Sequence, residues 1–281
     1  MRRAWLALRL VMVAMVFAFA GCGSGNGAAD EILEKNAEAR GGLAAWRDVK
    51  SMTMTGKLEA GIARDPVKLA RNFEPRAAPR SAAERRARLK HPPAAEAPVQ
   101  LPFVLELARP RKSRLEITFK GENAVQVYDG KSGWKVRPFL GRHDVEPFTA
   151  DELSLASAQA DLDGPLLDAS DKGSRVQLLG TEKVGGRDAY KLEVTPRSGA
   201  VRHVWVDTQT HLEVQVDGTR KLDGKARTVL TALRDYRKVD GLLVPHVLET
   251  TVEGVPGSEK ILVEQVQLNA PLDGARFSKP E

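Results

Sequence analysis

Apolar side chains recur at every second position along most of the chain after Lys50, and this is the period of a β-strand with one buried face. The runs with this alternation are Met52-Met54, Leu115-Ile117-Phe119, Val125-Val127, Trp134-Val136, Val176-Leu178, Tyr190-Leu192-Val194, Leu212-Val214-Val216, the stretches from Val229 and from Leu243 to Val252, Ile261-Val263 and Val266-Leu268. The pairs that separate them are typical of hairpin turns: Asp129-Gly130, Gly185-Gly186, Asp217-Gly218, Asp223-Gly224, Asp240-Gly241 and Pro256-Gly257. Roughly ten short strands at this spacing predict one large antiparallel meander.

Two segments have helical periodicity instead. Asp30 can cap a helix that runs to Arg40, and Gly41-Gly42 ends it before a further helical turn at 43–46. Thr149-Ala150-Asp151-Glu152 has the residues of a capping box and predicts a second helix that ends before Asp163. The sequence therefore predicts a mainly β protein with a few helices.

The first residues have the order of an export signal. Arg2 and Arg3 precede an apolar run over 10–21, which is shorter than the roughly 20 residues that a membrane-spanning helix needs. Phe19-Ala20-Gly21-Cys22 resembles the bacterial lipobox, with phenylalanine where leucine is usual. The resemblance implies cleavage before Cys22 and acyl chains on that cysteine, and such chains hold a protein to a bilayer. An ordinary signal peptide with a chance cysteine is the alternative.

We expect three parts along the chain. Residues 1–21 are the signal peptide, 22–29 are the acylated cysteine and a flexible glycine-rich tether, and 30–281 are a single domain. Within that domain, the segment 71–102 is rich in Ala, Pro and Arg and has little to bury, which predicts a disordered surface insertion. Its basic charge suits anionic head groups, although a solvated loop explains it as well.

Charge and cysteine content exclude several classes of protein. The chain has 43 basic and 37 acidic residues, and its net charge of +6 falls to +3 once Arg2, Arg3 and Arg9 leave with the signal peptide. This balance does not favour nucleic acid as a partner. The single cysteine, once acylated, can form no disulfide, so the fold must be stable without one.

Patterns for catalysis or metal binding are weak. None of the five histidines lies in HExxH spacing, and no cysteine pair is present to complete a zinc site. His203, Trp205 and Asp207 share one face of a predicted strand, with His211 soon after. A metal or acid–base pair is one interpretation, and ordinary strand residues with solvated polar edges are the other. We therefore expect no enzyme, no catalytic residues, no metal and no cofactor.

Short motifs along the chain resemble the LolA-like superfamily of outer-membrane lipoprotein-sorting proteins. In order, they are Ile32-Leu33-Glu34-Lys35 with Ala39-Arg40-Gly41-Gly42 and Trp46, Val49-Lys50-Ser51-Met52, Asp129-Gly130-Lys131-Ser132-Gly133-Trp134, Gly186-Arg187-Asp188-Ala189-Tyr190-Lys191-Leu192, Trp205-Val206-Asp207 with Leu212, Asp235-Tyr236-Arg237 with Val239-Asp240-Gly241-Leu242 and Pro245, and Asn269-Ala270-Pro271 to Phe277 and Pro280. They cover most of the chain outside the insertion. The resemblance implies a large curved antiparallel sheet, an incomplete or half barrel, with helices across its concave face.

An apolar concave face that is imperfectly covered leaves a dry slot suited to acyl chains. The residues expected to line such a ligand-binding slot are Leu115, Ile117, Phe119, Val125, Val127, Trp134, Tyr190, Leu192, Trp205, Leu212 and Val214. A closed core explains the same residues.

The leading hypothesis is a lipoprotein of the cell envelope that binds acyl chains of lipids or lipoproteins without catalysis. Gly23, and not aspartate, follows Cys22, which by the sorting rule of model bacteria favours the outer membrane, facing the periplasm. The alternative is an envelope scaffold or sensor that uses the same fold to bind a protein partner. A third hypothesis, an envelope hydrolase, rests on His203 and Asp207 alone.

Overall fold

The computed structural model describes residues 25–60, 99–222 and 224–281. The expected signal peptide, Cys22 and positions 71–98 of the expected insertion lie outside the described residues. Among the described helices, none is long and apolar enough to cross a membrane.

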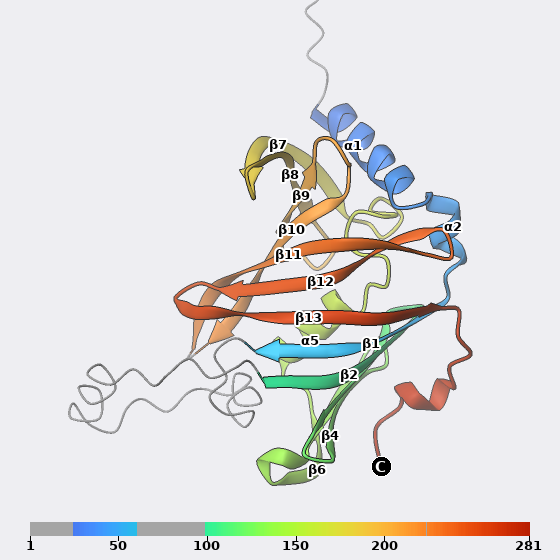
Figure 1. Ribbon diagram of the computed structural model, residues 1–281, viewed down its shortest axis with the longest axis vertical. Helices are drawn as coiled ribbons and strands as arrows, with labels where there is room; N and C mark the ends of the chain where they lie inside the picture. The colour runs from blue at the N-terminus through green and yellow to red at the C-terminus, as the bar shows by residue number, and fades with distance from the viewer. Residues whose placement is uncertain (1–24, 61–98, 223) are drawn as a thin grey trace, which may run out of the picture.

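The described chain is dominated by one antiparallel sheet of 13 strands that stays open and curves (Figure 1). The strands are β1 (Ser51–Ala60), β2 (Val99–Ala108), β3 (Lys112–Phe119), β4 (Glu122–Tyr128), β5 (Gly133–Arg137), β6 (Arg142–Pro147), β7 (Arg175–Val184), β8 (Arg187–Thr195), β9 (Arg202–Asp207), β10 (Glu213–Leu222), β11 (Lys225–Val239), β12 (Leu242–Val252) and β13 (Val255–Leu268). Their order is β6-β5-β4-β3-β2-β1-β13-β12-β11-β10-β9-β8-β7, so β6 and β7 are the two edges. This confirms the predicted mainly β class and the open, half-barrel sheet.

Most of the predicted turns connect strands, but two do not. Gly185 and Gly186, with φ of 57° and 84°, join β7 to β8, and Asp240-Gly241 joins β11 to β12. The predicted turn at Asp217-Gly218 is wrong, because both residues pair with β11 inside β10. The predicted turn at Pro256-Gly257 is also wrong, because β13 begins at Val255 and Gly254, with φ of 70°, makes the reversal. In both cases the segment pairs with a neighbouring strand, and this pairing outweighs the local preference of these residues for a turn.

The helices are α1 (Gly25–Ala39), α2 (Leu43–Asp48) and α5 (Ala150–Gln159), with short 3-10 turns η1 (Pro138–Leu140) and η2 (Gly274–Phe277). Thr149 caps α5 through the predicted capping box with Glu152. The expected tether over 22–29 needs correction, because α1 begins at Gly25 and its Ala29 is fully buried. Burial against the sheet outweighs the low helix propensity of the glycines.

The expected insertion over 71–102 also needs correction at its end. Residues 99–102 are the start of β2, where they pair with the last residues of β1. Pro102 removes one backbone donor, yet its neighbour Leu101 is buried in the sheet. Strand pairing with β1 therefore overrides the Ala- and Pro-rich composition that favoured a loop.

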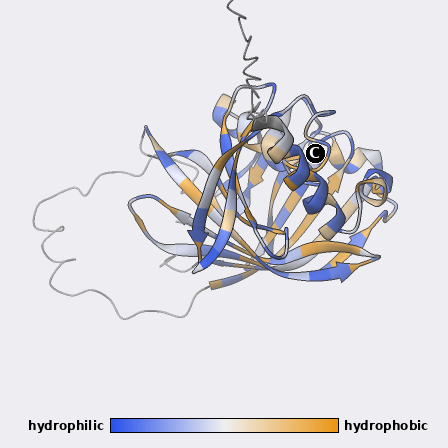
Figure 2. Ribbon diagram, turned by 90° about the horizontal axis from the view of Figure 1, so that it is seen from above, coloured by the Kyte–Doolittle hydropathy of each residue, from blue (hydrophilic) through white to orange (hydrophobic). Residues whose placement is uncertain are grey.

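Strand register defines the two faces of the sheet, because residues directly opposite each other on neighbouring strands point to the same side. One face carries both buried clusters and is called the inner face. Its first cluster is Trp46, Val49, Met52, Leu107, Leu162, Leu167, Leu242 and Val244, and its second is Ile32, Leu166, Leu192, Val194, Val204 and Val206. Along the strands, hydrophobic and hydrophilic residues alternate, as the view from above shows (Figure 2).

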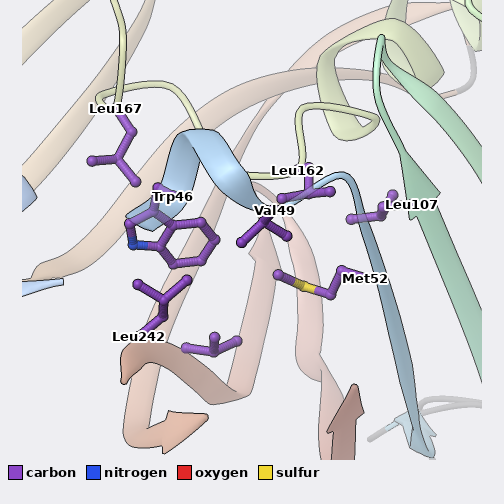
Figure 3. Close-up of a cluster of buried hydrophobic side chains, with 8 residues drawn as sticks. Trp46, Val49, Met52, Leu107, Leu162, Leu167 and Leu242 are labelled. Carbon is purple, nitrogen blue, oxygen red and sulfur yellow. The ribbon is translucent and has the colours of Figure 1, made fainter. Parts of the chain in front are cut away.

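The N-terminal helices and the segment 160–174 cover part of the inner face. In the first cluster, Trp46 of α2 lies between strand residues and Leu162 and Leu167 of that segment (Figure 3). Ile32 of α1 and Leu166 contribute to the second cluster. Both clusters are thus closed by elements from outside the sheet, near α1 and α2.

Candidate functional site

A continuous apolar row crosses the inner face away from those covering elements. Leu233 of β11 lies opposite Leu248 of β12, which lies opposite Ile261 of β13. Ile261 lies opposite Leu58 of β1, and Leu58 lies opposite Leu101 of β2. These five residues, Leu233, Leu248, Ile261, Leu58 and Leu101, form what we call the apolar row. With neighbouring strands about 4.8 Å apart, a row across five strands is about 19 Å wide.

The apolar row is only partly buried. Leu101 is 5% exposed, while the other four side chains are half-buried. The next row along the strands contains Val263, Gly56 and Phe103, which are buried, and Ile117, which is half-buried. The inner face therefore changes from closed core to partly open apolar surface along its strands.

Helix α5 lies over the inner face close to β5. Glu152 of α5 forms an ion pair with Lys135, which lies opposite Gln126 and so on the same face as Leu115. No residue of α5 is fully buried, although the helix contains Leu153 and Leu155. Leu153 and Leu155 are only half-buried, so α5 covers the apolar face less tightly than α1 and α2 do, as expected of a cover that leaves room for a ligand.

The residues predicted to line a slot do not all share one face. Leu115, Ile117, Tyr190 and Leu192 lie on the inner face, as their register with Leu105, Phe103, Val206 and Val204 shows. Phe119 continues this face at the end of β3 and is half-buried. Val125, Val127 and Trp134 lie on the outer face, because Val125 is opposite Glu116 and Val127 is opposite both Arg114 and Trp134.

The remaining predicted residues also lie apart from the apolar row. Trp205 is on the outer face with Lys191, where its Nε1 donates to Oε2 of Glu182 at 2.9 Å. Leu212 precedes β10, and Val214 lies at a register shift between β9 and β10. The sheet thus brings together Leu115, Ile117 and Phe119 with the apolar row, and separates them from Val125, Val127, Trp134 and Trp205.

Sequence reasoning missed the apolar row itself. Leu101 lies inside the segment 71–102 that the composition predicts as an insertion, and Leu58 lies before that segment. Leu233, Leu248 and Ile261 are predicted only as strand residues. Their alternation signalled a buried face in each strand. Nothing local signalled that these five positions lie side by side, because strand register is set by the whole sheet.

Asp207 has a structural role that explains its burial. Its Oδ1 accepts hydrogen bonds from the backbone N–H groups of Gln209 and Thr210, at 3.0 and 2.8 Å, and closes the turn between β9 and β10. Arg187 forms an ion pair with its Oδ2 at 2.9 Å. Burial acts to raise the pKa of Asp207, but the two backbone hydrogen bonds and Arg187 outweigh it and hold that pKa below its ordinary value.

His203 does not join Asp207. Its Nδ1 lies 2.7 Å from Oδ2 of Asp217 on β10, and its ring is 6.0 Å from that of Trp205, centroid to centroid. Among residues 25–60, 99–222 and 224–281, no group of three or more histidine, cysteine or acidic side chains could hold a metal ion. The contacts of His203 are therefore those of an ordinary strand residue, and the contacts of Asp207 are those of an ordinary turn residue.

A shallow hollow of about 600 Å³ lies at another place, where β1 and β2 meet η2. Lys50, Arg109 and Lys112 are among the residues that line it, together with Asn269 and Phe277. Arg109 already donates hydrogen bonds to the backbone oxygens of Val49 and Trp46 and to the carboxylate of Asp163. The hollow is polar and is distinct from the apolar row.

The fold resembles that of several solved structures, and we therefore describe it as LolA-like. A putative outer-membrane lipoprotein-sorting protein domain from Vibrio parahaemolyticus is 12% identical, with a TM-score of 0.52, over 89% of this chain and 97% of the other. A LolA superfamily protein from Nitrosomonas europaea is 16% identical, with a TM-score of 0.53 and the same coverage of both chains. A DUF1329 family protein from Desulfovibrio piger is 13% identical, with a TM-score of 0.54, over 90% and 97%. No protein-family model and no curated protein matches the chain significantly.

Proposed function

We propose that this chain is a membrane-anchored lipoprotein of the cell envelope, and that it binds acyl chains of lipids or lipoproteins on the inner face of its LolA-like sheet. The apolar row is the observation that carries this proposal. Binding is by burial of hydrocarbon, and no bond is made or broken.

The physical basis is the transfer of methylene groups out of water. Each buried methylene contributes about 0.8 kcal/mol, so even a partly covered chain is held by several kcal/mol. The row is about 19 Å wide, which exceeds the ~15 Å thickness of one hydrocarbon leaflet, so it can follow a complete acyl chain. Leu115, Ile117 and Phe119 extend the same surface on β3, and we include them among the residues that contact the acyl chain.

The anchor in this proposal is Cys22, acylated after cleavage behind Gly21. It places the domain in the periplasm at the outer membrane. Labelling cells with an alkyne fatty acid tests the anchor, since the parent chain should carry the label and Cys22→Ser should not. A labelled Cys22→Ser chain would show that the lipid is attached elsewhere.

Photolabelling tests acyl-chain binding with the whole protein in its own membrane. Cells are fed a fatty acid with a diazirine in its chain, irradiated, and the labelled peptides are identified by mass spectrometry. We expect label on β11, β12, β13 and β1 at the inner face. Leu233→Asp should abolish it, while Leu230→Asp on the outer side of the same strand should leave it unchanged. Label that is absent from the inner face, or equal in both variants, would exclude the proposal.

A protein partner is the second candidate function, and the open edge of the sheet favours it. β7 is an edge strand of 10 residues, and its Leu179 is 47% exposed. Such an edge can accept a strand from another chain. Crosslinking from Leu179 in whole cells separates the two functions: one stoichiometric protein supports a scaffold or sensor, and diverse lipidated proteins support a carrier.

A further inference from the structure

Two arginines face each other on the inner side of the sheet, beyond the apolar row. Arg220 of β10 lies directly opposite Arg227 of β11. Both belong to the inner face, because they alternate in step with Val216 and Thr231, and Val216 packs on the second cluster. Like charges directly opposite each other destabilise a pair of strands. Their placement therefore calls for a negative partner.

The nearby carboxylates satisfy this need only in part. Glu259 of β13 lies 3.5 Å from Nη1 of Arg220, well outside the roughly 2.8 Å of a charge-assisted hydrogen bond. Glu253 is exposed and accepts a hydrogen bond from the backbone N–H of Thr228 at 3.2 Å. Arg227 extends toward the turn at Gly254, where a Cβ would lie 2.8 Å from its Nη1. Glu253 also attracts Arg227 electrostatically. Among the described residues, neither guanidinium has a hydrogen bond to a carboxylate, so both keep N–H groups that can bind an anion.

The position of these groups relative to the apolar row suits an amphiphile. Thr231 and Thr250 lie one step along the strands from Leu233 and Leu248, and their hydroxyl oxygens are 3.0 Å apart. Glu259 lies opposite Thr250 in the same polar line. The inner face therefore runs from buried core, through the apolar row, to a line of hydroxyls and then to the two arginines.

We propose that Arg220 and Arg227 bind the anionic head group of an amphiphile whose acyl chain lies on the apolar row. This rests on the proposed function and adds the chemical class of its ligand, an amphiphile with a phosphate or carboxylate at one end. The anion takes the place of Glu259 beside Arg220. Of the two paired hydroxyls of Thr231 and Thr250, the one that accepts from the other can donate its own proton to an oxygen of the anion. Planar guanidinium groups match such oxygens in pairs.

The test compares two lipids that differ only in a phosphate. All strand pairings and both clusters lie after Ala29, so the chain from position 22, with Cys22→Ser, retains all the described packing that forms the sheet. Binding of 1-palmitoyl-lysophosphatidate and of 1-palmitoylglycerol to this soluble chain is measured by calorimetry. We expect the phosphate to tighten binding about tenfold, and Arg220→Gln with Arg227→Gln to remove that preference. Raising the ionic strength should also reduce the difference in affinity between the two lipids, because salt screens the attraction between the phosphate and the arginines.

Two further variants complete the test. Glu259→Gln removes the internal competitor and should tighten lysophosphatidate binding several-fold, while leaving palmitoylglycerol unchanged. Arg234→Gln is the matched control, because Arg234 is exposed and alternates to the outer face of β11. Thermal melts of each variant confirm that it is folded.

The outcomes separate this inference from the function on which it rests. Equal binding of both lipids, unchanged by the arginine variants, overturns the head-group site and leaves acyl-chain binding intact. Failure of both lipids to bind overturns the proposed function as well. Inorganic phosphate that binds as tightly as lysophosphatidate, with no binding of palmitoylglycerol, overturns the amphiphile in favour of a free-anion site.

Discussion

The guanidinium of Arg40 lies over the indole ring of Trp46, with its Cζ 4.4 Å from the ring centroid. The same guanidinium donates to Oε1 of Glu213 at 3.1 Å and to the backbone oxygen of Asp163 at 2.9 Å. Trp46 in turn donates from Nε1 to the backbone oxygen of Arg40 at 3.0 Å. One side chain therefore ties the N-terminal helices to the sheet and to the segment 160–174.

Loss of Arg40 should be costly, because it leaves the buried carboxylate of Glu213 without its charge partner. We expect Arg40→Ala to lower the free energy of unfolding by about 3–5 kcal/mol, measured by urea denaturation. The double variant Arg40→Met with Glu213→Gln should regain much of that loss. Lys35→Ala, which breaks the exposed ion pair with Glu31, should cost about 0.5 kcal/mol or less. A cost for Arg40→Ala as small as that of Lys35→Ala would show that the buried ion pair does not hold the N-terminal helices on the sheet.

The segment 160–174 is held over the inner face by a second set of charges. Arg109 donates from Nη2 to Oδ2 of Asp163 at 2.6 Å, and Lys172 pairs with both Asp163 and Asp161. Burial acts to raise the pKa of Asp163, but Lys172 and Arg109 outweigh it and hold that pKa below its ordinary value. Asp163 is therefore charged in the folded protein, and its segment is pinned by ion pairs as well as by Leu162 and Leu167.

Asp207 predicts a dependence of stability on pH. Its pKa is lowered in the fold, so its contribution is complete above the unfolded pKa of about 3.9 and is lost as the pH falls through the lower folded value. Between neutral pH and about pH 3, Asp207→Asn should lose less of its unfolding free energy than the parent does. Urea midpoints at several pH values measure this difference. Parallel pH profiles for the two chains would contradict it.

Leu192 and Leu248 should respond differently to truncation. Leu192 is fully buried, so Leu192→Ala should cost about 2–5 kcal/mol of unfolding free energy. Leu248 is half-buried in the apolar row, so Leu248→Ala should cost about 1 kcal/mol and weaken acyl-chain binding. Denaturation and calorimetry on the same samples test both effects. If Leu248→Ala were as destabilising as Leu192→Ala and bound lipid normally, the apolar row would be ordinary core.

Gly56 lies where β1 and β13 shift register, and no side chain fits there. A Cβ at this position would lie 2.0 Å from the backbone oxygen of Leu262, so the strands would have to separate. We expect Gly56→Ala to cost about 2 kcal/mol or more, or to prevent folding. Gly218 also lies within a strand but has open space around it, so Gly218→Ala should be neutral or slightly stabilising. Similar melting temperatures for the two variants would be the contrary result.

Sequence patterns predicted local features well where the physics is local. The capping box at Thr149 and the helix end at Gly41-Gly42 depend on a few neighbouring residues, and the structure confirms both. The turns predicted at Gly218 and Gly257 are wrong because distant strands supply partners for those backbones. Ala29 is predicted to belong to a flexible tether, but it is buried because α1 packs against residues that are distant in the sequence.

The alternation of apolar residues determined by itself that the chain forms many strands with a buried face, because the two sides of a strand are set by backbone geometry. Only the tertiary structure decided which side faces inward and which residues of different strands become neighbours. Val127 and Leu192 have the same local pattern and the same complete burial, yet they lie on opposite faces. Register and curvature arise from pairing between strands far apart in the chain, so the apolar row and the paired arginines exist only once the whole sheet has formed.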